Sequence, residues 1–184
     1  RDYVNAVRDE VRHMSGLVNE LLSFSKAGLR GKDLALSTVE LGPLLDRVVA
    51  REAAEEDAVR IQAPEALAAV AEPELLARAV GNLLRNALRY AGHAGPVELT
   101  TAGQGDEVVI TVADQGPGVP PESLAKLCEP FYRPDAARTR EQGGVGLGLA
   151  IVKSCVDACQ GKLALRNRQP QGFEGEIRLR RAGS

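Results

Sequence analysis

No apolar run in the sequence approaches the ~20 residues that a membrane-spanning helix needs, and we expect no signal peptide in this stretch. The chain also lacks an excess of either charge, because 23 Lys and Arg residues against 25 Asp and Glu residues give a formal net charge of −2. Bulk electrostatics therefore do not draw it to nucleic acid or to an anionic membrane. With 184 residues and 44% hydrophobic composition, it is long enough to bury one core.

Cysteine is scarce, and its spacing does not match a metal site. Cys128, Cys155 and Cys159 are odd in number and form neither a CxxC pair nor a Cys/His cluster. A reducing cytoplasm is the simpler interpretation. Cys155 and Cys159 are four residues apart, on the same helical side as Leu149 and Val152, so we expect them to fill the core rather than to carry redox chemistry.

Two familiar phosphate-binding motifs are also missing, although EQGGVGLGLAIV holds four glycines between positions 143 and 148. Counted from Gly144 or Gly146, the last glycine of the dinucleotide fingerprint is replaced by Leu149 or Ile151. Gly148 is not followed by the Lys-Ser/Thr of a phosphate loop. The preceding PFYRPDAARTREQ is not strand-like. What remains is a flexible segment whose backbone N–H groups could face an anion at a helix N-terminus.

The N-terminal region has the apolar spacing of a heptad seam. The seam residues, spaced by three and four, are Val4, Val7, Val11, Met14, Val18 and Leu21. Such a seam needs a partner helix, and a core-facing helix of the same domain is the alternative. The pattern stops at KAGLRGK, which predicts a helical unit at 1–27, a linker at 28–36 and a globular domain at 37–184. The chain starts at Arg1 within this pattern, so we expect it to belong to a longer protein.

The rest of the chain predicts an α+β domain with helices layered on one mostly antiparallel sheet. Helices are expected to start at Gly42-Pro43, at Glu72-Pro73 and near Leu147. The predicted strands are Thr38–Leu41, Val59–Gln62, Ala68–Ala71, Val97–Ala102, Val108–Asp114, Lys162–Asn167 and Glu174–Arg180.

Three polar residues share one side of the helix after Pro73. Asn82, Asn86 and Arg89 follow each other at spacings of four and three. A solvated polar face would explain them, but Asn is a poor helix-interior residue. The functional interpretation is a metal-phosphate site, because an amide oxygen suits Mg²⁺ and an arginine suits phosphate.

The segment ADQGPGVP places Asp114 at the end of a predicted strand. On its own it is consistent with an ordinary turn. A buried Asp114 carboxylate would instead accept a hydrogen bond from the exocyclic amine of adenine, and guanine offers a carbonyl there. Gly116 and Gly118 would let the backbone approach the base closely.

The following segment, LCEPFYRPDAARTRE, combines an aromatic pair with several arginines. Phe131 and Tyr132 stand among Arg133, Arg138 and Arg140. A surface loop with an aromatic anchor is one interpretation. The other is a lid, pinned by Phe131, that closes arginines over a polyphosphate.

Taken in order, these segments resemble the ATP-binding catalytic domain of bacterial sensor histidine kinases. NLLRNALRY is similar to the Asn box, DQGPG to the first glycine box, EPFYRPD to the Phe box and GGVGLGLAIV to the second glycine box. The resemblance runs from about Leu36 to the C-terminus, and FYRPDAARTRE looks like the envelope-stress type. It implies a two-layer α/β sandwich, the Bergerat-type ATP-binding fold of gyrase, mismatch-repair and chaperone ATPases, preceded by one long helix of a dimerisation hairpin.

The resemblance also implies the cofactors, ATP and Mg²⁺, and the roles of individual residues. Asn86 would coordinate Mg²⁺ with Asn82 nearby, Asp114 would recognise adenine, and Arg89-Tyr90 stands where the family usually has Lys-Tyr. The implied ATP-binding residues are Asn82, Asn86, Arg89, Tyr90, Asp114, Gly116, Gly118, Phe131, Arg133, Arg138, Arg140, Gly144, Val145, Gly146, Leu147 and Gly148.

RHMSGLVNELLSFSKAG resembles the second helix of the family's dimerisation and phosphoacceptor hairpin. Neither His13 nor His93 matches the phosphoacceptor, so no catalytic residue is assigned in this chain, which is expected to bind ATP without labelling itself. The implied parent is a dimeric histidine kinase that relays phosphate to a response regulator, with this domain on the cytoplasmic side of an inner-membrane anchor. No nucleic-acid partner is expected. The alternatives are a gyrase- or chaperone-type ATPase, a serine kinase of the anti-sigma type, and a nucleotide-binding regulatory module without phosphoryl transfer.

Overall fold

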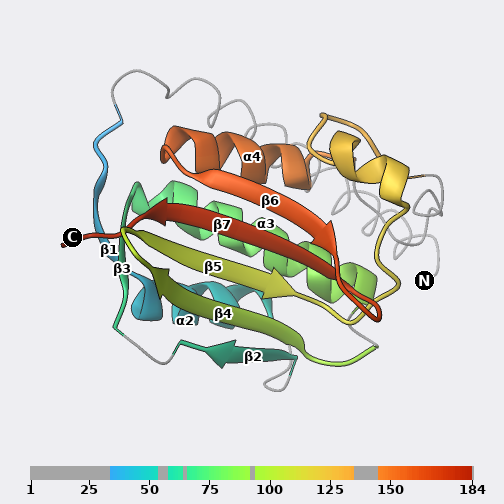
Figure 1. The fold of residues 1–184 in the computed structure, drawn as a ribbon, viewed down its shortest axis with the longest axis horizontal. Helices are drawn as coiled ribbons and strands as arrows, with labels where there is room; N and C mark the ends of the chain where they lie inside the picture. The colour runs from blue at the N-terminus through green and yellow to red at the C-terminus, as the bar shows by residue number, and fades with distance from the viewer. Residues whose placement is uncertain (1–33, 54–57, 64–65, 92–93, 135–144, 184) are drawn as a thin grey trace, which may run out of the picture.

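Five strands form one mixed sheet that spans the molecule (Figure 1). The structure is a computed structural model, and it describes residues 34–53, 58–63, 66–91, 94–134 and 145–183. The strand order is β2-β4-β5-β7-β6, with β2 parallel to β4 and the other neighbours antiparallel. The strands are β2 Val59–Gln62, β4 Val97–Gln104, β5 Glu107–Ala113, β6 Lys162–Asn167 and β7 Phe173–Arg180. The mostly antiparallel sheet is thus confirmed.

A second, two-stranded sheet lies beside the first. It pairs β1 (Ser37–Glu40) with β3 (Ala68–Ala71) in antiparallel register. An isolated bridge between Ala69 and Arg181 ties this pair to the chain just after β7. The sequence predicted both strands but not their separation from the main sheet, because alternation along a strand does not specify its partner.

Three helices cover one face of the main sheet (Figure 1): α2 Leu41–Glu52, α3 Pro73–Ala91 and α4 Gly148–Ala158. The central helix, α3, packs against both of the others. Its N-terminus is capped by Glu72, whose carboxylate accepts a hydrogen bond from the N–H of Leu75 at 2.6 Å. The arrangement is a two-layer α/β sandwich, as predicted.

The core lies between these helices and the sheet. Leu84 of α3, Leu99 of β4, Ile110 of β5 and Ile177 of β7 are all fully buried. Each apolar side chain of this size, removed from water, contributes roughly 1.5–3 kcal/mol to folding. Burial of this layer fixes α3 over the middle of the sheet, and α3 carries the two asparagines.

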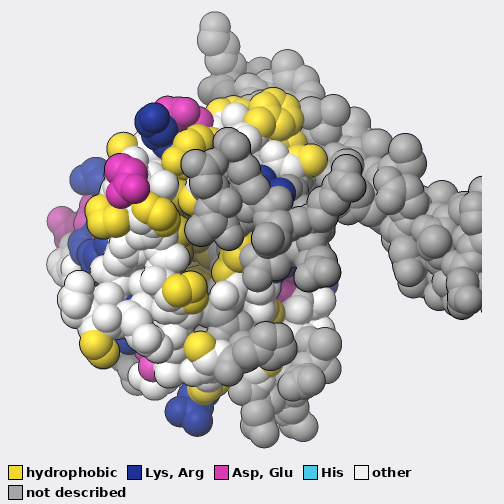
Figure 2. Space-filling model, turned by 90° about the vertical axis from the view of Figure 1, so that its right-hand side faces the viewer, with side chains coloured by type: hydrophobic (Ala, Val, Ile, Leu, Met, Phe, Trp, Pro, Cys, Tyr) yellow, Lys and Arg dark blue, Asp and Glu magenta, His cyan; other side chains and the backbone are white. Residues whose placement is uncertain are grey.

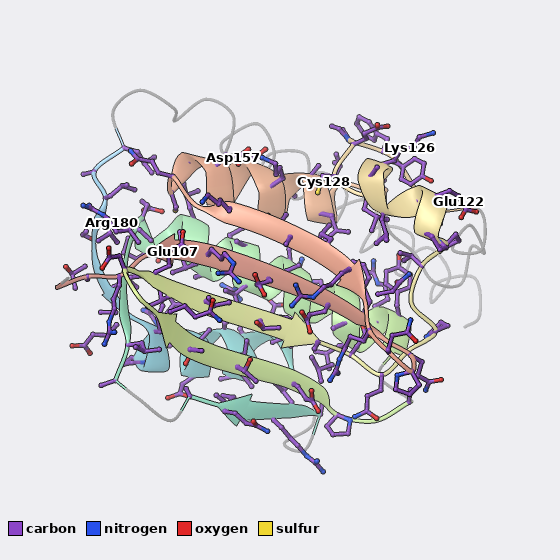
Figure 3. All side chains as sticks on the ribbon, viewed as in Figure 1. Glu107, Glu122, Lys126, Cys128, Asp157 and Arg180 are labelled. Carbon is purple, nitrogen blue, oxygen red and sulfur yellow. The ribbon has the colours of Figure 1, made fainter. Side chains whose placement is uncertain are left out.

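The other face of the sheet is polar, as the alternation of its strands requires. Glu107 and Arg180 lie on it (Figure 3). Arg178 bonds Glu176 at 2.6 Å and lies 3.5 Å from Glu107, and Lys162 lies 3.7 Å from Glu107. Ion pairs within and between strands therefore occupy this face.

Element boundaries agree with the predictions to within a few residues, and the differences are local. The first hairpin strand, β4, runs on to Gln104, and a 3-10 helix, η1, at Pro121–Lys126 was not predicted. Cys155 and Cys159 are 0% and 3% exposed, which confirms their place in the core. Within the described ranges, no helix is both long enough and apolar enough to cross a membrane. The heptad seam at 1–27 and residues 28–33 of the linker lie outside the described residues.

Candidate functional site

A pocket of about 290 Å³ opens where β5 ends and α4 begins. Helix α3 forms one wall, the loop after β5 another, and the start of α4 a third. Figure 2 looks onto this end of the molecule, where hydrophobic side chains are visible among polar and charged ones. The sequence-predicted residues that line the pocket are Asn82, Asn86, Arg89, Tyr90, Asp114, Gly118, Arg133, Val145, Gly146 and Gly148.

The two asparagines differ in how their amides are used. Asn82 is 6% exposed, donates to the carbonyl oxygen of Arg78 at 2.9 Å and accepts from Arg85 at 3.3 Å. The side chain of Asn86 makes no hydrogen bond to any described residue, so its amide oxygen is available to a ligand. A Cβ at Gly148 would lie 3.4 Å from that oxygen. The start of α4 therefore lies directly against Asn86.

Arg85, which the sequence analysis did not assign, lies between the asparagines in the sequence and lines the pocket. It forms a two-point ion pair with Glu52 at the end of α2, with both N···O distances 3.0 Å. Burial raises the pKa of Glu52, but the hydrogen bonds and charges of Arg85 and Arg51 outweigh it and hold the pKa below its ordinary value. Arg85 is thus committed to Glu52 and Asn82. Its position in NLLRNALRY was the only sequence signal for it.

Asp114 is 5% exposed, directly after β5. Its Oδ1 accepts hydrogen bonds from the backbone N–H groups of Gly116 at 2.8 Å and Phe173 at 3.1 Å. Burial raises the pKa of Asp114, and these two bonds and the charge of Arg168 offset the rise only in part. Within the described chain Oδ2 has no hydrogen-bond partner. The carboxylate is therefore fixed by one oxygen and has the other available as an acceptor in the pocket.

The loop after Asp114 needs glycine at one position in particular. Gly118 has a φ of +73°, and a Cβ there would lie 2.7 Å from Oδ1 of Asn167. Both facts make any side chain at this position strained. Gly116 is buried and does not line the pocket; its N–H holds Asp114 instead.

The two described ends of the expected lid are bonded to each other. The N–H of Phe131 donates to the carbonyl oxygen of Gly146 at 3.0 Å. Gly146 has a φ of +78°, and a Cβ there would lie 2.7 Å from the carbonyl oxygen of Tyr132. The segment between them, 135–144, lies outside the described residues, and with it the predicted Arg138, Arg140 and Gly144.

The predicted role of the Phe131 side chain as an anchor of the lid stays a prediction, and in this structure that side chain points away from the pocket. Phe131 is 64% exposed with a φ of +66°, and it does not line the pocket. Its backbone makes the anchoring contact. Tyr132 takes the place in the pocket, and its hydroxyl donates to Ser123 at 3.1 Å. A positive φ at Phe131 turns the two neighbouring aromatic side chains in different directions, which a linear pattern does not reveal.

Two further residues depart from expectation. Leu147 is 1% exposed and packs in the core, so it supports the start of α4 rather than lining the pocket. Phe173 and Gly175 of β7 also line the pocket, and no sequence motif predicted their place there. A Cβ at Gly175 would lie 2.7 Å from Leu83, so the glycine makes room for α3.

The residues available for a metal are few. No group of three or more His, Cys, Asp or Glu side chains that could hold a metal ion occurs in the described part of the chain. The amide oxygen of Asn86 is the hard, neutral donor in the pocket. This donor set fits Mg²⁺ that keeps most of its waters and takes phosphate oxygens from a ligand, and it does not fit a closed protein cage.

Helices on one face of a sheet, with a pocket between the central helix and a buried Asp after a strand, define a two-layer α/β ligand-binding domain. A family model described as "Histidine kinase-, DNA gyrase B-, and HSP90-like ATPase" matches residues 71–183. The chain belongs to this family.

Its relatives are named as sensor kinases. The alginate biosynthesis sensor protein KinB of Pseudomonas aeruginosa is 31% identical over 176 residues, which cover 93% of this chain and 29% of KinB. The sensor histidine kinase CpxA of Escherichia coli K12 is 34% identical over 160 residues, which cover 84% of this chain and 34% of CpxA. The chain thus spans about a third of these relatives.

Solved structures show the same fold. Full-length ShkA in complex with AMPPNP is 30% identical with a TM-score of 0.80, covering 100% of this chain and 39% of that chain. The mycobacterial sensor histidine kinase MprB is 28% identical with a TM-score of 0.70, covering 79% of this chain and 98% of that chain. The predicted family and the α/β fold of the ATP-binding domain are confirmed, whereas the predicted preceding helix lies outside the described residues.

Proposed function

We propose that the pocket binds Mg²⁺-ATP and that the chain is the catalytic domain of a sensor histidine kinase. One observation carries the proposal: the carboxylate of Asp114 and the amide of Asn86, on different elements, open into the same pocket. Their chemistry fits the two ends of one ligand, because a carboxylate accepts from an adenine amine and an amide oxygen suits Mg²⁺. The family match and the AMPPNP complex of ShkA support the same ligand.

The remaining lining residues fit the phosphates. Arg89 has no hydrogen bond or ion pair to another described residue, so its guanidinium is available to an anion. Helix α4 begins at Gly148, and the N–H groups and the helix dipole at this N-terminus favour negative charge. Arg133 lines the pocket at the described end of the lid. We propose that Arg138, Arg140 and Gly144 complete this set.

The proposed reaction is transfer of the terminal phosphoryl group of ATP to a histidine. A nitrogen of the acceptor imidazole bonds to the γ-phosphorus as the bond from phosphorus to the β,γ-bridging oxygen breaks, which releases ADP. Bound Mg²⁺ would neutralise charge on the phosphate oxygens. The chain's own residues hold and orient the nucleotide, and positioning is the main protein contribution to such transfers.

The whole protein is proposed to be a dimer with further parts. Residues 1–27 would be the second helix of a dimerisation and phosphoacceptor hairpin, and the acceptor histidine would lie elsewhere in the protein, since His13 and His93 do not match it. A response regulator would receive the phosphoryl group. This domain would lie on the cytoplasmic side of a membrane anchor. The relatives' names as sensor kinases support this arrangement.

Calorimetric titration tests the ligand. ATP with and without Mg²⁺ is titrated into the wild type, Asn86→Ala and the control Gln104→Ala, an exposed amide at the far end of β4. We expect Mg²⁺ to strengthen ATP binding in the wild type and control but not in Asn86→Ala. Equal Mg²⁺ dependence in all three would remove Asn86 as the metal ligand, and absence of ATP binding would refute the proposal.

Incubation with γ-labelled ATP tests the reaction. The chain alone is expected to incorporate no acid-labile phosphate. Addition of a histidine-bearing dimerisation domain from the same protein is expected to produce labelling of that domain. Labelling of this chain by itself would show that the acceptor has been misplaced.

A further inference from the structure

The loop at residues 114–120 forms the base-contact side of the pocket without belonging to a strand or helix. Its backbone groups must therefore find partners outside regular secondary structure. Most of these partners come from one place, the end of β6 and the turn into β7. Asp114 and Phe173 bond through their backbones at 2.9 Å, and Gln171 donates to the carbonyl oxygen of Gln115 at 3.0 Å.

Asn167, the last residue of β6, makes two of these contacts with a single side chain. Its Oδ1 accepts from the N–H of Val119 at 2.9 Å, and its Nδ2 donates to the carbonyl oxygen of Val119 at 2.7 Å. One side chain thus satisfies both backbone groups of Val119, in the manner of a neighbouring strand. Val119 and the adjacent Gly118 and Pro120 line the pocket.

Two glycines let the end of β6 and the turn into β7 approach the loop closely. A Cβ at Gly118 would lie 2.7 Å from Oδ1 of Asn167, within the volume that the amide occupies. A Cβ at Gly172 would overlap the carbonyl oxygen of Asp114, so Gly172 lets the turn approach Asp114. Arg168 donates to the same carbonyl oxygen at 3.3 Å. Close approach of the turn to the loop is built into the backbone at both positions.

We infer that Asn167 is a positioning residue for base selection: it fixes the loop of residues 114–120, and thereby sets the shape of the pocket around Asp114. Asn167 itself does not line the pocket. The inference rests on the proposed adenine-nucleotide site. It assigns part of the selectivity of that site to a residue 53 positions after Asp114 and outside every motif that marks the site in the sequence.

The test compares ATP and GTP affinities of the wild type, Asn167→Ala and Val108→Ala. Val108 is fully buried at the opposite end of β5, so its substitution lowers stability without touching the loop. Loss of two hydrogen bonds from the loop is expected to weaken ATP binding about tenfold or more, with a smaller effect on GTP. The ratio of ATP to GTP affinity should therefore fall in Asn167→Ala and stay at the wild-type value in Val108→Ala.

A purely structural role predicts a different result. Asn167→Ala would then lower the melting temperature as Val108→Ala does, with the affinity ratio unchanged, and this outcome overturns the inference. Asn167→Ser, whose hydroxyl can still bond one backbone group of Val119, is the milder variant if Asn167→Ala does not fold. It should lower the ratio of ATP to GTP affinity by less than Asn167→Ala does. An unchanged ratio in Asn167→Ser again overturns the inference. Failure of the wild type to prefer ATP would refute the proposed adenine site itself and is recognisable before any variant is measured.

Discussion

Replacing Asp114 by asparagine changes the polarity of one atom in the pocket with almost no change in shape. The amide oxygen of Asn can keep the bonds that Oδ1 accepts from the N–H groups of Gly116 at 2.8 Å and Phe173 at 3.1 Å. The NH₂ group then occupies the position of Oδ2. Where the wild type offers an acceptor to a base amine, Asp114→Asn offers a donor.

The expected loss of affinity follows from the burial of the site. A hydrogen bond to a charged acceptor contributes about 1.5–3 kcal/mol, and two donors facing each other at a site only 5% exposed leave a buried donor unsatisfied at about 1–3 kcal/mol. Together these terms predict that ATP binding weakens by at least about a hundredfold. Isothermal titration of ATP into both proteins measures this change.

Although Asp114→Asn should weaken ATP binding, its folding stability should rise or stay the same. The folded-state pKa of Asp114 lies above its ordinary value of 3.8 because burial outweighs the bonds from Gly116 and Phe173 and the charge of Arg168. A raised pKa means that the group favours folding below its unfolded pKa and that this contribution is lost as pH rises through the folded pKa. At neutral pH the ionised carboxylate is therefore unfavourable, and Asp114→Asn should melt no lower than the wild type.

A control variant separates the site from general charge effects. Asp106→Asn removes the same charge from an exposed turn between β4 and β5 and should leave both ATP affinity and melting temperature unchanged. Lowering the pH toward the raised pKa of Asp114 should weaken ATP binding to Asp106→Asn more than to Asp114→Asn. If Asp114→Asn keeps ATP affinity within about threefold of the wild type, the assignment of Asp114 as the base acceptor is refuted. A threefold change corresponds to less than the ~1.4 kcal/mol of a tenfold change, well below the loss expected here.

Three further predictions test other parts of the molecule. Asn86→Ala should abolish the Mg²⁺ dependence of ATP binding while leaving the affinity for metal-free ATP within about threefold of the wild type, measured by titration in the presence of a chelator. Equal loss of affinity for ATP with and without Mg²⁺ would point to a folding defect. Gly146→Ala should lower the free energy of unfolding by about 1–3 kcal/mol in urea denaturation, because the φ of Gly146 is +78° and the new Cβ would lie 2.7 Å from the carbonyl oxygen of Tyr132. Gly105 has a φ of +60° but open space around it, so Gly105→Ala should lower the free energy of unfolding by less. Burial raises the pKa of Cys155 to about 11, so this thiol should resist alkylation at pH 8 in the folded protein and react on unfolding; rapid modification of the native protein would contradict its burial.

Much of the fold was predictable because its signals are local. Apolar spacing of three and four along residues 73–91 placed α3, and alternation about GQGD placed the β4–β5 hairpin. The helix start at Pro73 follows from a proline that needs no N–H partner in the first turn. These features depend on residues within one or two turns of each other, so a single sequence contains them.

The site was predictable where its residues belong to one element and less so where elements meet. Asn82, Asn86 and Arg89 share one face of α3, and all three line the pocket. Which of the neighbouring residues Phe131 and Tyr132 lines the pocket was not predictable, because the direction of a side chain in an irregular loop depends on backbone angles that no periodic pattern encodes.

The sequence by itself determined the family and the core, and it placed Asn86 and Asp114 in the candidate site, since each rests on residue types at short, fixed spacing. Only the tertiary structure decided how those groups are held. The bond from Arg85 to Glu52 spans 33 positions, that from Asn167 to Val119 spans 48, and that from Phe173 to Asp114 spans 59. Contacts at such separations depend on the pairing of β7 between β5 and β6 and on the packing of α2 against α3. The energy that selects them comes from burial of the whole core rather than from any local preference.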